Sequence, residues 1–261
     1  MYCTEVPGNM LSPFVRCAMR IRRLLRTFYG AFDRVFVLNS DHHKWLTGRE
    51  MNFAKSKVCL TAHWADDIFK PKKVSKSEVL GIEDNRPVAL YVGRVSKEKG
   101  ALELPHIYKL VKKAIPDVAF LVVGKGPASK QLKKEMPEGD YLDWVSHEQL
   151  PAIYSAADIL VFPSKFDTFS CVVLESLRCG LPVVAYNTKG PKDIICDSEC
   201  GYLVNTEEQM AEKVIICLSN LQQQQKFKKA AVKRAKNYDA NSILERYMAD
   251  VGLATGKYKY H

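Results

Sequence analysis

Two cations and a glycine follow one of the apolar segments of this chain. The stretch GRVSKEKG, residues 93–100, comes after PVALYV and places Arg94 and Lys99 just before a predicted helix. The amino end of a helix favours anions, and two cations beside it strengthen that preference, because Arg offers a planar set of hydrogen-bond donors and Lys a compact positive charge. Gly93 lets the backbone turn closely. The segment predicts a diphosphate-binding loop, although two solvated cations after a strand would give the same pattern.

Two carboxylates stand eight residues apart in FDTFSCVVLESLRCGLPVVAY, residues 166–186. Asp167 lies in a predicted loop, and Glu175 lies inside the helix predicted to start at Ser170. Five residues along a helix are about 7.5 Å, so Glu175 is set back while Asp167 lies at the helix mouth. We expect one carboxylate to hold a sugar and the other a second hydroxylated group. Alternatively, both serve only the helix dipole.

Glycines also follow two other predicted strands. GKGP, residues 124–127, carries Gly124 and Gly126, which permit a flat or phosphorylated ligand to approach, or form a tight turn. YNTKGPKDII, residues 186–195, is predicted to be a Gly-Pro turn that closes the same crevice, or a plain loop.

Runs of Val, Ile, Leu and Phe with little alternation predict strands that are buried on both faces. Because they alternate with helical patterns, they predict a parallel, doubly wound α/β sheet that binds ligands at the carboxyl ends of its strands. The predicted strands are 87–93, 118–124, 140–145, 158–164, 182–187 and 201–204, and the predicted helices are 98–114, 128–135, 148–155, 170–179, 207–220, 222–237 and 241–251.

The first part of the chain predicts fewer elements. These are a helix at 14–32, a strand at 34–39, a helix from an N-cap at Ser40 to Gly48, and a strand at 57–61. The helix at 14–32 either packs on a sheet or lies on an anionic membrane surface, because it is amphipathic and carries five arginines, Arg16, Arg20, Arg22, Arg23 and Arg26. The predicted organisation is an incomplete α/β domain at 1–66, a charged linker at 67–86, a larger domain at 87–238, and a helix and tail at 239–261.

Composition excludes several classes of protein. With 261 residues, 47% apolar and 26% charged, the chain is neither disordered nor collagen-like. The net charge of +10 suits phosphorylated small molecules or an anionic membrane; a nucleic-acid partner is not expected, because the basic excess lacks interleaved aromatic residues. The eight cysteines contain no CxxC pair, and Cys171 lies in an apolar run like a small core residue. We expect a reducing cytoplasm and no metal site.

The combination of these segments resembles a known family. GR…KG, GKGP, Leu150–Tyr154–Asp158 before FPS, and D-x7-E with LxCGLPVVA are similar in order and spacing to the donor domain of family 4 retaining glycosyltransferases of the GT-B fold. The resemblance covers about residues 87–205, and SCVVLESLRCGLPVVA is its most specific block. DRVFVLNSDHHKWL and DIFKP resemble the end of the family's amino-terminal acceptor domain and its hinge.

The resemblance implies a role for each matching residue. Arg94 and Lys99 would bind the nucleotide diphosphate and stabilise it as it leaves. Asp167, where the family more often has Glu, would hold the donor sugar, and Glu175 would hold the ribose. Arg94, Lys99 and Asp167 are thus the candidate catalytic residues, and the candidate substrate-binding residues are Gly93, Gly124, Gly126, Val145, Phe169, Ser170, Cys171 and Glu175, with Asp143–Val145 bordering the nucleoside. Transfer would need neither a metal nor a cofactor.

Two departures from the family pattern concern Ser170 and Cys3. Ser170 replaces the usual Gly and adds bulk beside the sugar. Cys3 stands where relatives that transfer sugars to lipids have His, and the chain begins too late to match most of the acceptor domain. A phosphorylase or an epimerase on the same fold is disfavoured because its further catalytic residues are missing.

The resemblance therefore implies retaining transfer of a hexose from a UDP- or GDP-sugar to a lipid or glycan, in the cytoplasm or peripherally on the membrane. The alternative is a non-catalytic nucleotide-sugar-binding module, or a half-enzyme that needs a partner chain or upstream residues. We expect this chain by itself to bind a nucleotide sugar and to transfer it poorly.

Overall fold

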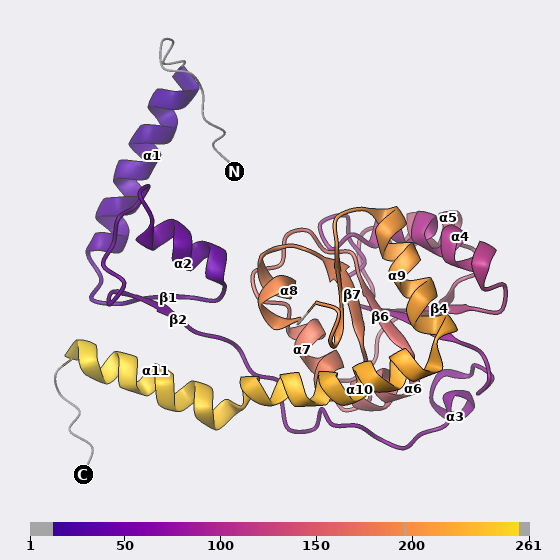
Figure 1. The fold of residues 1–261 in the computed structure, drawn as a ribbon. Helices are drawn as coiled ribbons and strands as arrows, with labels where there is room; N and C mark the ends of the chain where they lie inside the picture. Colours follow the sequence, from indigo (N-terminus) through magenta and orange to yellow (C-terminus); the bar gives the residue numbers. More distant parts are fainter. Residues whose placement is uncertain (1–12, 196, 256–261) are drawn as a thin grey trace. The chain divides into compact units, whose positions relative to one another are not determined.

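The computed structural model describes residues 13–195 and 197–255, and the side chains of these except at 13–20 and 253–255 (Figure 1). The chain divides into two compact units. The larger unit is Ala62–Arg246, and the smaller unit combines the chain up to Thr61 with the chain from Tyr247 onward.

A six-stranded parallel sheet forms the centre of the larger unit. Its order is β5-β4-β3-β6-β7-β8, and every neighbouring pair is parallel. This is the doubly wound topology that the sequence predicts. The strands are β3 (Val88–Val92), β4 (Ala119–Val123), β5 (Asp140–Leu142), β6 (Ile159–Phe162), β7 (Val183–Tyr186) and β8 (Gly201–Val204).

Helices cover both faces of this sheet. Helices α4 and α9 pack together over one face, and α7 and α10 pack together over the other (Figure 1). Burial on both faces explains why β3, β4, β6 and β7 are wholly apolar and wholly buried. The helices are α3 (Lys76–Leu80), α4 (Leu104–Ala114), α5 (Ser129–Glu135), α6 (Leu150–Ala156), α7 (Cys171–Arg178), α8 (Lys189–Ile194), α9 (Glu207–Ser219), α10 (Leu221–Ala235) and α11 (Ala240–Thr255), with short 3-10 helices η1 (Ala101–Glu103) and η2 (Lys236–Tyr238).

The prediction of a turn or loop at 186–195 was wrong, because helix α8 occupies most of this segment. Pro191 is the third residue of this helix, where a missing N–H removes no intrahelical bond. Gly190 packs so tightly that a Cβ atom there would lie 2.8 Å from the backbone of Phe169. The Gly-Pro pair therefore serves a close helix contact.

The segment predicted as a linker, 67–86, carries α3 and packs within the larger unit. Ser75 caps this helix by accepting a hydrogen bond from the Glu78 amide. Lys76 Nζ lies 2.6 Å from Asp158 Oδ2, and Phe69 and Leu80 are buried. The division between units falls at 61/62, ahead of the predicted boundary at 66/67.

The smaller unit contains a two-stranded parallel sheet, β1 (Val35–Val37) and β2 (Val58–Leu60), with α1 (Pro13–Gly30) and α2 (Ser40–Thr47). The predicted N-cap at Ser40 was wrong: Asn39 caps α2, because its Oδ1 accepts from the His42 amide at 2.9 Å. Cys3 lies outside the described residues, and so do the side chains of Arg16 and Arg20. The core of this unit comprises Val35, Val37, Leu46, Met51 and Val58.

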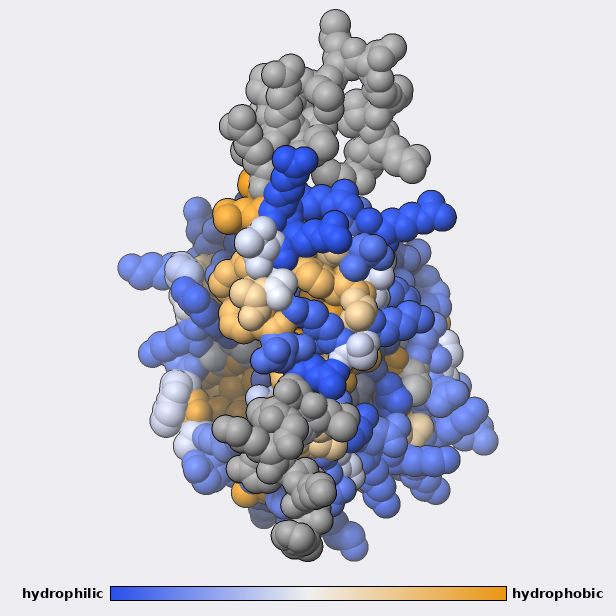
Figure 2. Space-filling model, turned by 90° about the vertical axis from the view of Figure 1, so that its left-hand side faces the viewer, coloured by the Kyte–Doolittle hydropathy of each residue, from blue (hydrophilic) through white to orange (hydrophobic). Residues whose placement is uncertain are grey.

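Helix α1 leaves apolar side chains in solvent although its Leu25 and Tyr29 pack on the small core. Figure 2 shows apolar side chains interspersed with hydrophilic ones on one face of the molecule. None of the described helices is long and apolar enough to cross a membrane. The exposed apolar residues of α1 and the turn after it are Ile21, Leu24, Phe28 and Phe32.

Candidate functional site

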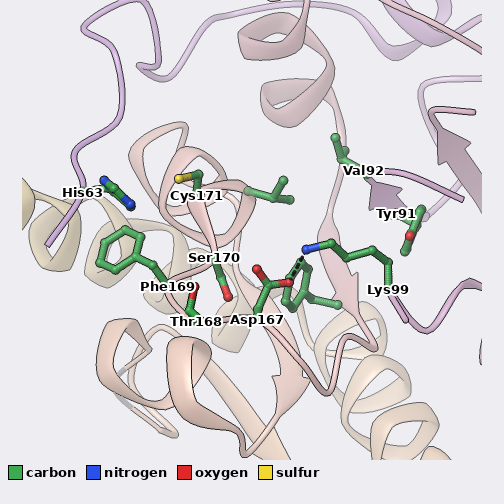
Figure 3. A pocket seen from close by; sticks show the side chains of 12 residues that line it. His63, Tyr91, Val92, Lys99, Asp167, Thr168, Phe169, Ser170 and Cys171 are labelled. Atoms are coloured by element: carbon green, nitrogen blue, oxygen red, sulfur yellow. Dashed lines mark hydrogen bonds and ion pairs between the residues drawn. The ribbon is translucent and has the colours of Figure 1, made fainter. Parts of the chain in front are cut away.

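A cavity opens at the carboxyl ends of β3 and β6. These strands are neighbours at the centre of the sheet, where the strand order reverses, and this is where doubly wound sheets bind ligands. The cavity has a volume of about 270 Å³ (Figure 3). Its lining residues are His63, Tyr91, Val92, Gly93, Lys99, Phe162, Asp167, Thr168, Phe169, Ser170, Cys171 and Val172.

An ion pair inside the cavity joins two predicted site residues. Lys99 Nζ, from the loop after β3, lies 2.8 Å from Asp167 Oδ2, in the loop after β6 (Figure 3). The side chain of Lys99 is 39% exposed and that of Asp167 is 14% exposed. Sheet topology brings these groups together across 68 positions of sequence. The cation expected to bind phosphate is therefore paired with the carboxylate expected to bind sugar.

Arg94 lies outside this lining. Its side chain is 64% exposed and approaches Glu98 at 3.9 Å. The carbonyl of Arg94 accepts a hydrogen bond from the Tyr91 hydroxyl at 2.9 Å, which holds the backbone of the loop, while the guanidinium lies in solvent. The structure thus places Lys99 in the cavity and Arg94 on the surface beside it.

The glycines of the two neighbouring loops allow backbones to pack together. A Cβ atom on Gly124 would lie 2.1 Å from the Gly93 carbonyl oxygen, and one on Gly126 would lie 2.2 Å from that of Val95. Of these glycines, Gly93 lines the cavity, whereas Gly124 and Gly126 support the loop that carries it. Close backbone packing in a tight turn therefore explains Gly124 and Gly126 without a ligand.

The amino end of α7 forms the floor of the cavity. Amides in the first turn of a helix have no intrahelical partner, which makes this end attractive to anions. The Gly190 amide donates to the Asp167 carbonyl at 3.2 Å, so α8 supports the loop from behind. Phe169 is buried, and its ring lies edge-on to the rings of His63 and Tyr238.

Ser170 carries unusual backbone strain just before α7. Its φ of 78° and ψ of 69° are left-handed, a conformation that costs roughly 1–2 kcal/mol for a residue with a Cβ atom. Its hydroxyl is buried and has no hydrogen-bond partner among the described residues. Leaving such a group unsatisfied costs roughly 1–3 kcal/mol.

Cys171 differs from its prediction as a core residue, because it is exposed at the first position of α7. Desolvation of the thiol, together with the charges of Glu175 and Asp167, raises its pKa above the ordinary value. The thiol is therefore protonated at neutral pH and is a poor nucleophile.

Glu175 lies farther along α7, as predicted, and outside the lining of the cavity. The Tyr154 hydroxyl donates to Glu175 Oε2 at 2.9 Å. Burial raises the pKa of Glu175, and the hydrogen bond from Tyr154 and the nearby His147 oppose that rise. Tyr154 is itself fully buried, so it holds the carboxylate in a fixed direction.

The loop after β5 also lies outside the lining. Asp143 pairs with Lys125 at 3.2 Å and with Lys133 at 3.1 Å, which lowers its pKa. Trp144 is 78% exposed, whereas Val145 is half-buried. In the part of the chain that the structure describes, no group of three or more His, Cys, Asp or Glu side chains could hold a metal ion.

His63 lines the cavity although no sequence pattern predicted a site residue at this position. It precedes the segment that Arg178, at the end of α7, holds by donating to the carbonyls of Ala65 at 2.8 Å and Phe69 at 3.3 Å. These long-range bonds bring His63 to the cavity. The only sequence signal for them is an arginine at the end of a predicted helix, which is too common to be informative.

Residues 73–234 match the family described as Glycosyl transferases group 1. The chain belongs to this family. D-inositol 3-phosphate glycosyltransferase of Mycobacteroides abscessus is 28% identical over 209 residues, which are 74% of this chain and 45% of that protein. Alpha-D-kanosaminyltransferase of Streptomyces kanamyceticus is 29% identical over 167 residues, 60% of this chain and 43% of that protein. This group 1 chain thus spans less than half the length of these two relatives.

A solved structure of HepE from Anabaena, in complex with UDP and glucose, shares the fold of this group 1 chain. The TM-score is 0.76 at 18% identity, covering 94% of this chain and 69% of that chain. At this identity the likeness shows the fold alone, which is of the GT-B type.

Proposed function

We propose that this group 1 protein is a retaining glycosyltransferase whose larger unit binds a nucleotide sugar. The observation that carries the proposal is the cavity at the carboxyl ends of β3 and β6, where Lys99, Asp167 and the amino end of α7 meet. Cation, helix end and carboxylate together suit a phosphate joined to a hydroxylated ring. The HepE structure that shares this fold holds UDP and glucose, which favours UDP as the nucleotide to test first.

Each residue has a role in the proposed transfer. Lys99 and Arg94 neutralise the diphosphate as the bond between the anomeric carbon and the phosphate oxygen breaks and its electron pair leaves with the nucleotide. Preorganised cations stabilise such developing charge without a metal. Asp167 holds hydroxyls of an oxocarbenium-like sugar, an acceptor hydroxyl attacks the anomeric carbon from the same face, and its proton passes to the departing phosphate oxygen. Glu175 holds the ribose, while Gly93, Gly124, Gly126 and Val145 border the nucleotide, and the amides of Phe169, Ser170 and Cys171 meet the sugar and the adjoining phosphate.

The proposed roles require the ion pair between Lys99 and Asp167 to open. A diphosphate would take the cation, and the sugar hydroxyls would take the carboxylate. Arg94 has no strong partner to give up, because its only described ion pair is a 3.9 Å contact between two exposed side chains. The exposed guanidinium would therefore bind the diphosphate without first breaking a strong ion pair.

The alternative is a module that binds nucleotide sugars without transferring them. Incubating the purified protein with UDP- and GDP-hexoses and a panel of glycan and lipid acceptors separates the two functions. NMR of the product gives its anomeric configuration. A product that keeps the donor configuration supports the proposal, an inverted product refutes retention, and binding without any product favours the module.

We further propose a lipid acceptor on an anionic membrane surface, reached from the cytoplasm. Support comes from α1, which combines solvent-exposed Ile21, Leu24 and Phe28 with exposed arginines. Amphipathic helices that join an apolar face to basic residues bind anionic lipid surfaces. The described arginine side chains on this helix are Arg22, Arg23 and Arg26.

A further inference from the structure

Ser170 combines three properties that no other described residue shares. It lines the cavity, its backbone is left-handed, and its buried hydroxyl lacks a partner. Among the residues that the structure describes, the other non-glycine residues with positive φ are Asn52 and Ser198, and neither lines the cavity. Glycine at this position would avoid both the strain and the unsatisfied hydroxyl. A strained residue with an unused polar group is a sign of function when it lies in a binding site.

Two other serines provide an internal comparison. Ser96 and Ser164 also have buried hydroxyls without a partner in the described part of the chain. Both have ordinary backbone conformations, and neither lines the cavity. An unpartnered hydroxyl therefore occurs elsewhere near the strand ends, but only at Ser170 does it coincide with strain and with the cavity.

We propose that the hydroxyl of Ser170 donates a hydrogen bond to the phosphate group that joins the donor sugar. This inference rests on the proposed function. The hydroxyl has no existing bond to break, so it needs only to rotate about the Cα–Cβ bond toward the cavity. The same cavity is lined by Lys99 and by the first residues of α7, whose amides have no intrahelical partner, and both groups attract an anion. The sugar hydroxyls, by contrast, have the Asp167 carboxylate as their acceptor.

The hydroxyl consequently adds a side-chain donor to the main-chain donors of the helix end. A bond from a hydroxyl to a charged phosphate oxygen is stronger than a neutral one. It makes the site more selective for ligands that carry this second phosphate. Ligands that end at the first phosphate would not reach it.

The test is calorimetric binding of UDP, UMP and UDP-glucose, with GDP, GMP and GDP-mannose as the second series, to the full chain and to Ser170→Ala. We expect about a tenfold loss of affinity for the diphosphate and the nucleotide sugar and no change for the monophosphate, because one charge-assisted bond is lost. We also expect the melting temperature of the ligand-free variant to rise by about 2–4 °C, because a buried unsatisfied group is gone. Ser164→Ala is the matched control: it should also become more stable while its affinities stay unchanged.

Ser170→Gly provides a second variant that relieves the backbone strain and should fold at least as well as the parent. Unchanged diphosphate affinity in both variants would show that the hydroxyl does not contact the phosphate and would overturn the inference. Equal losses for monophosphate and diphosphate, or a loss for the nucleotide sugar alone, would place the contact elsewhere and overturn the inference. If the parent chain binds no nucleotide in either series, the proposed function fails together with this inference. If the parent and both variants bind the nucleotides equally well, only the inference about Ser170 fails.

Discussion

Replacing Asp167 by asparagine should tighten the binding of a nucleoside diphosphate. Lys99 Nζ is paired with Asp167 Oδ2 at 2.8 Å, so a diphosphate must compete with the carboxylate for this cation. Asparagine keeps the size of the side chain and removes its charge. The variant should therefore bind the diphosphate more strongly, while it binds and transfers the sugar less well.

The size of the effect follows from the geometry of the pair. Unit charges separated by 2.8 Å attract by about 1.5 kcal/mol in bulk water and about 6 kcal/mol at an effective dielectric constant of about 20. Because 39% of the Lys99 side chain is exposed, solvent screening reduces the net contribution to about 1–2 kcal/mol. Diphosphate affinity should rise by about 5–30-fold.

Isothermal titration calorimetry of UDP and GDP measures this change directly. Glu98→Gln is a suitable control, because it removes a carboxylate from the same loop whose 3.9 Å contact with Arg94 joins two mostly exposed side chains. We expect the control to change affinity by less than about twofold. The gain in Asp167→Asn should shrink at 1 M salt, where screening acts over about 3 Å. Unchanged or weaker diphosphate binding by Asp167→Asn at low salt would refute competition for Lys99.

Three further predictions concern the rest of the site and α1. Arg94→Ala and Lys99→Ala should each weaken nucleoside-diphosphate binding about ten- to a hundredfold in calorimetry, because each loses a charge-assisted bond. Glu175→Ala should weaken the binding of both the diphosphate and the nucleotide sugar. Tyr154→Phe should raise the pKa of Glu175, because it removes a hydrogen bond to the carboxylate, so acidification should abolish binding at a higher pH than in the parent. Replacing arginines of α1 by glutamine should reduce the fraction of protein that sediments with anionic vesicles, because each lost charge weakens binding by about 1 kcal/mol. The residues to replace are Arg22, Arg23 and Arg26.

Each of these predictions has a contrary outcome. Normal affinity in both Arg94→Ala and Lys99→Ala would remove the phosphate site from this loop. A pH profile of Tyr154→Phe that matches the parent would show that Tyr154 does not control the pKa of the Glu175 carboxylate. Tyr108→Phe is the control, because it removes a hydroxyl that bonds to Lys112 and Glu138 instead. Equal sedimentation with neutral and anionic vesicles would exclude α1 as an anionic-lipid contact.

The sequence by itself determined the parallel sheet of the larger unit and the edge of the sheet at which the cavity opens. Short, wholly apolar runs such as 88–92 and 119–123 indicate strands covered on both faces, and their alternation with helical patterns made the parallel sheet predictable. Because the carboxyl ends of parallel strands meet at one edge, the residues after them, including Lys99 and Asp167, were also predictable as neighbours. The rise of about 1.5 Å per residue along a helix likewise placed Glu175 behind the helix mouth.

Tertiary structure decided which of those residues meet and why. Helix α8 was predicted as a turn because Gly and Pro are turn residues in isolation, whereas Gly190 is needed for a close contact with Phe169 from a distant segment. Gly124 meets the Gly93 carbonyl for the same reason.

The strain at Ser170 and the arrival of His63 at the cavity also depend on contacts across the fold. The periodicity of apolar residues in the sequence indicates which face of a helix or strand is buried. The distance between two elements, and therefore which side chain fits between them, is set only when the helices and strands pack together.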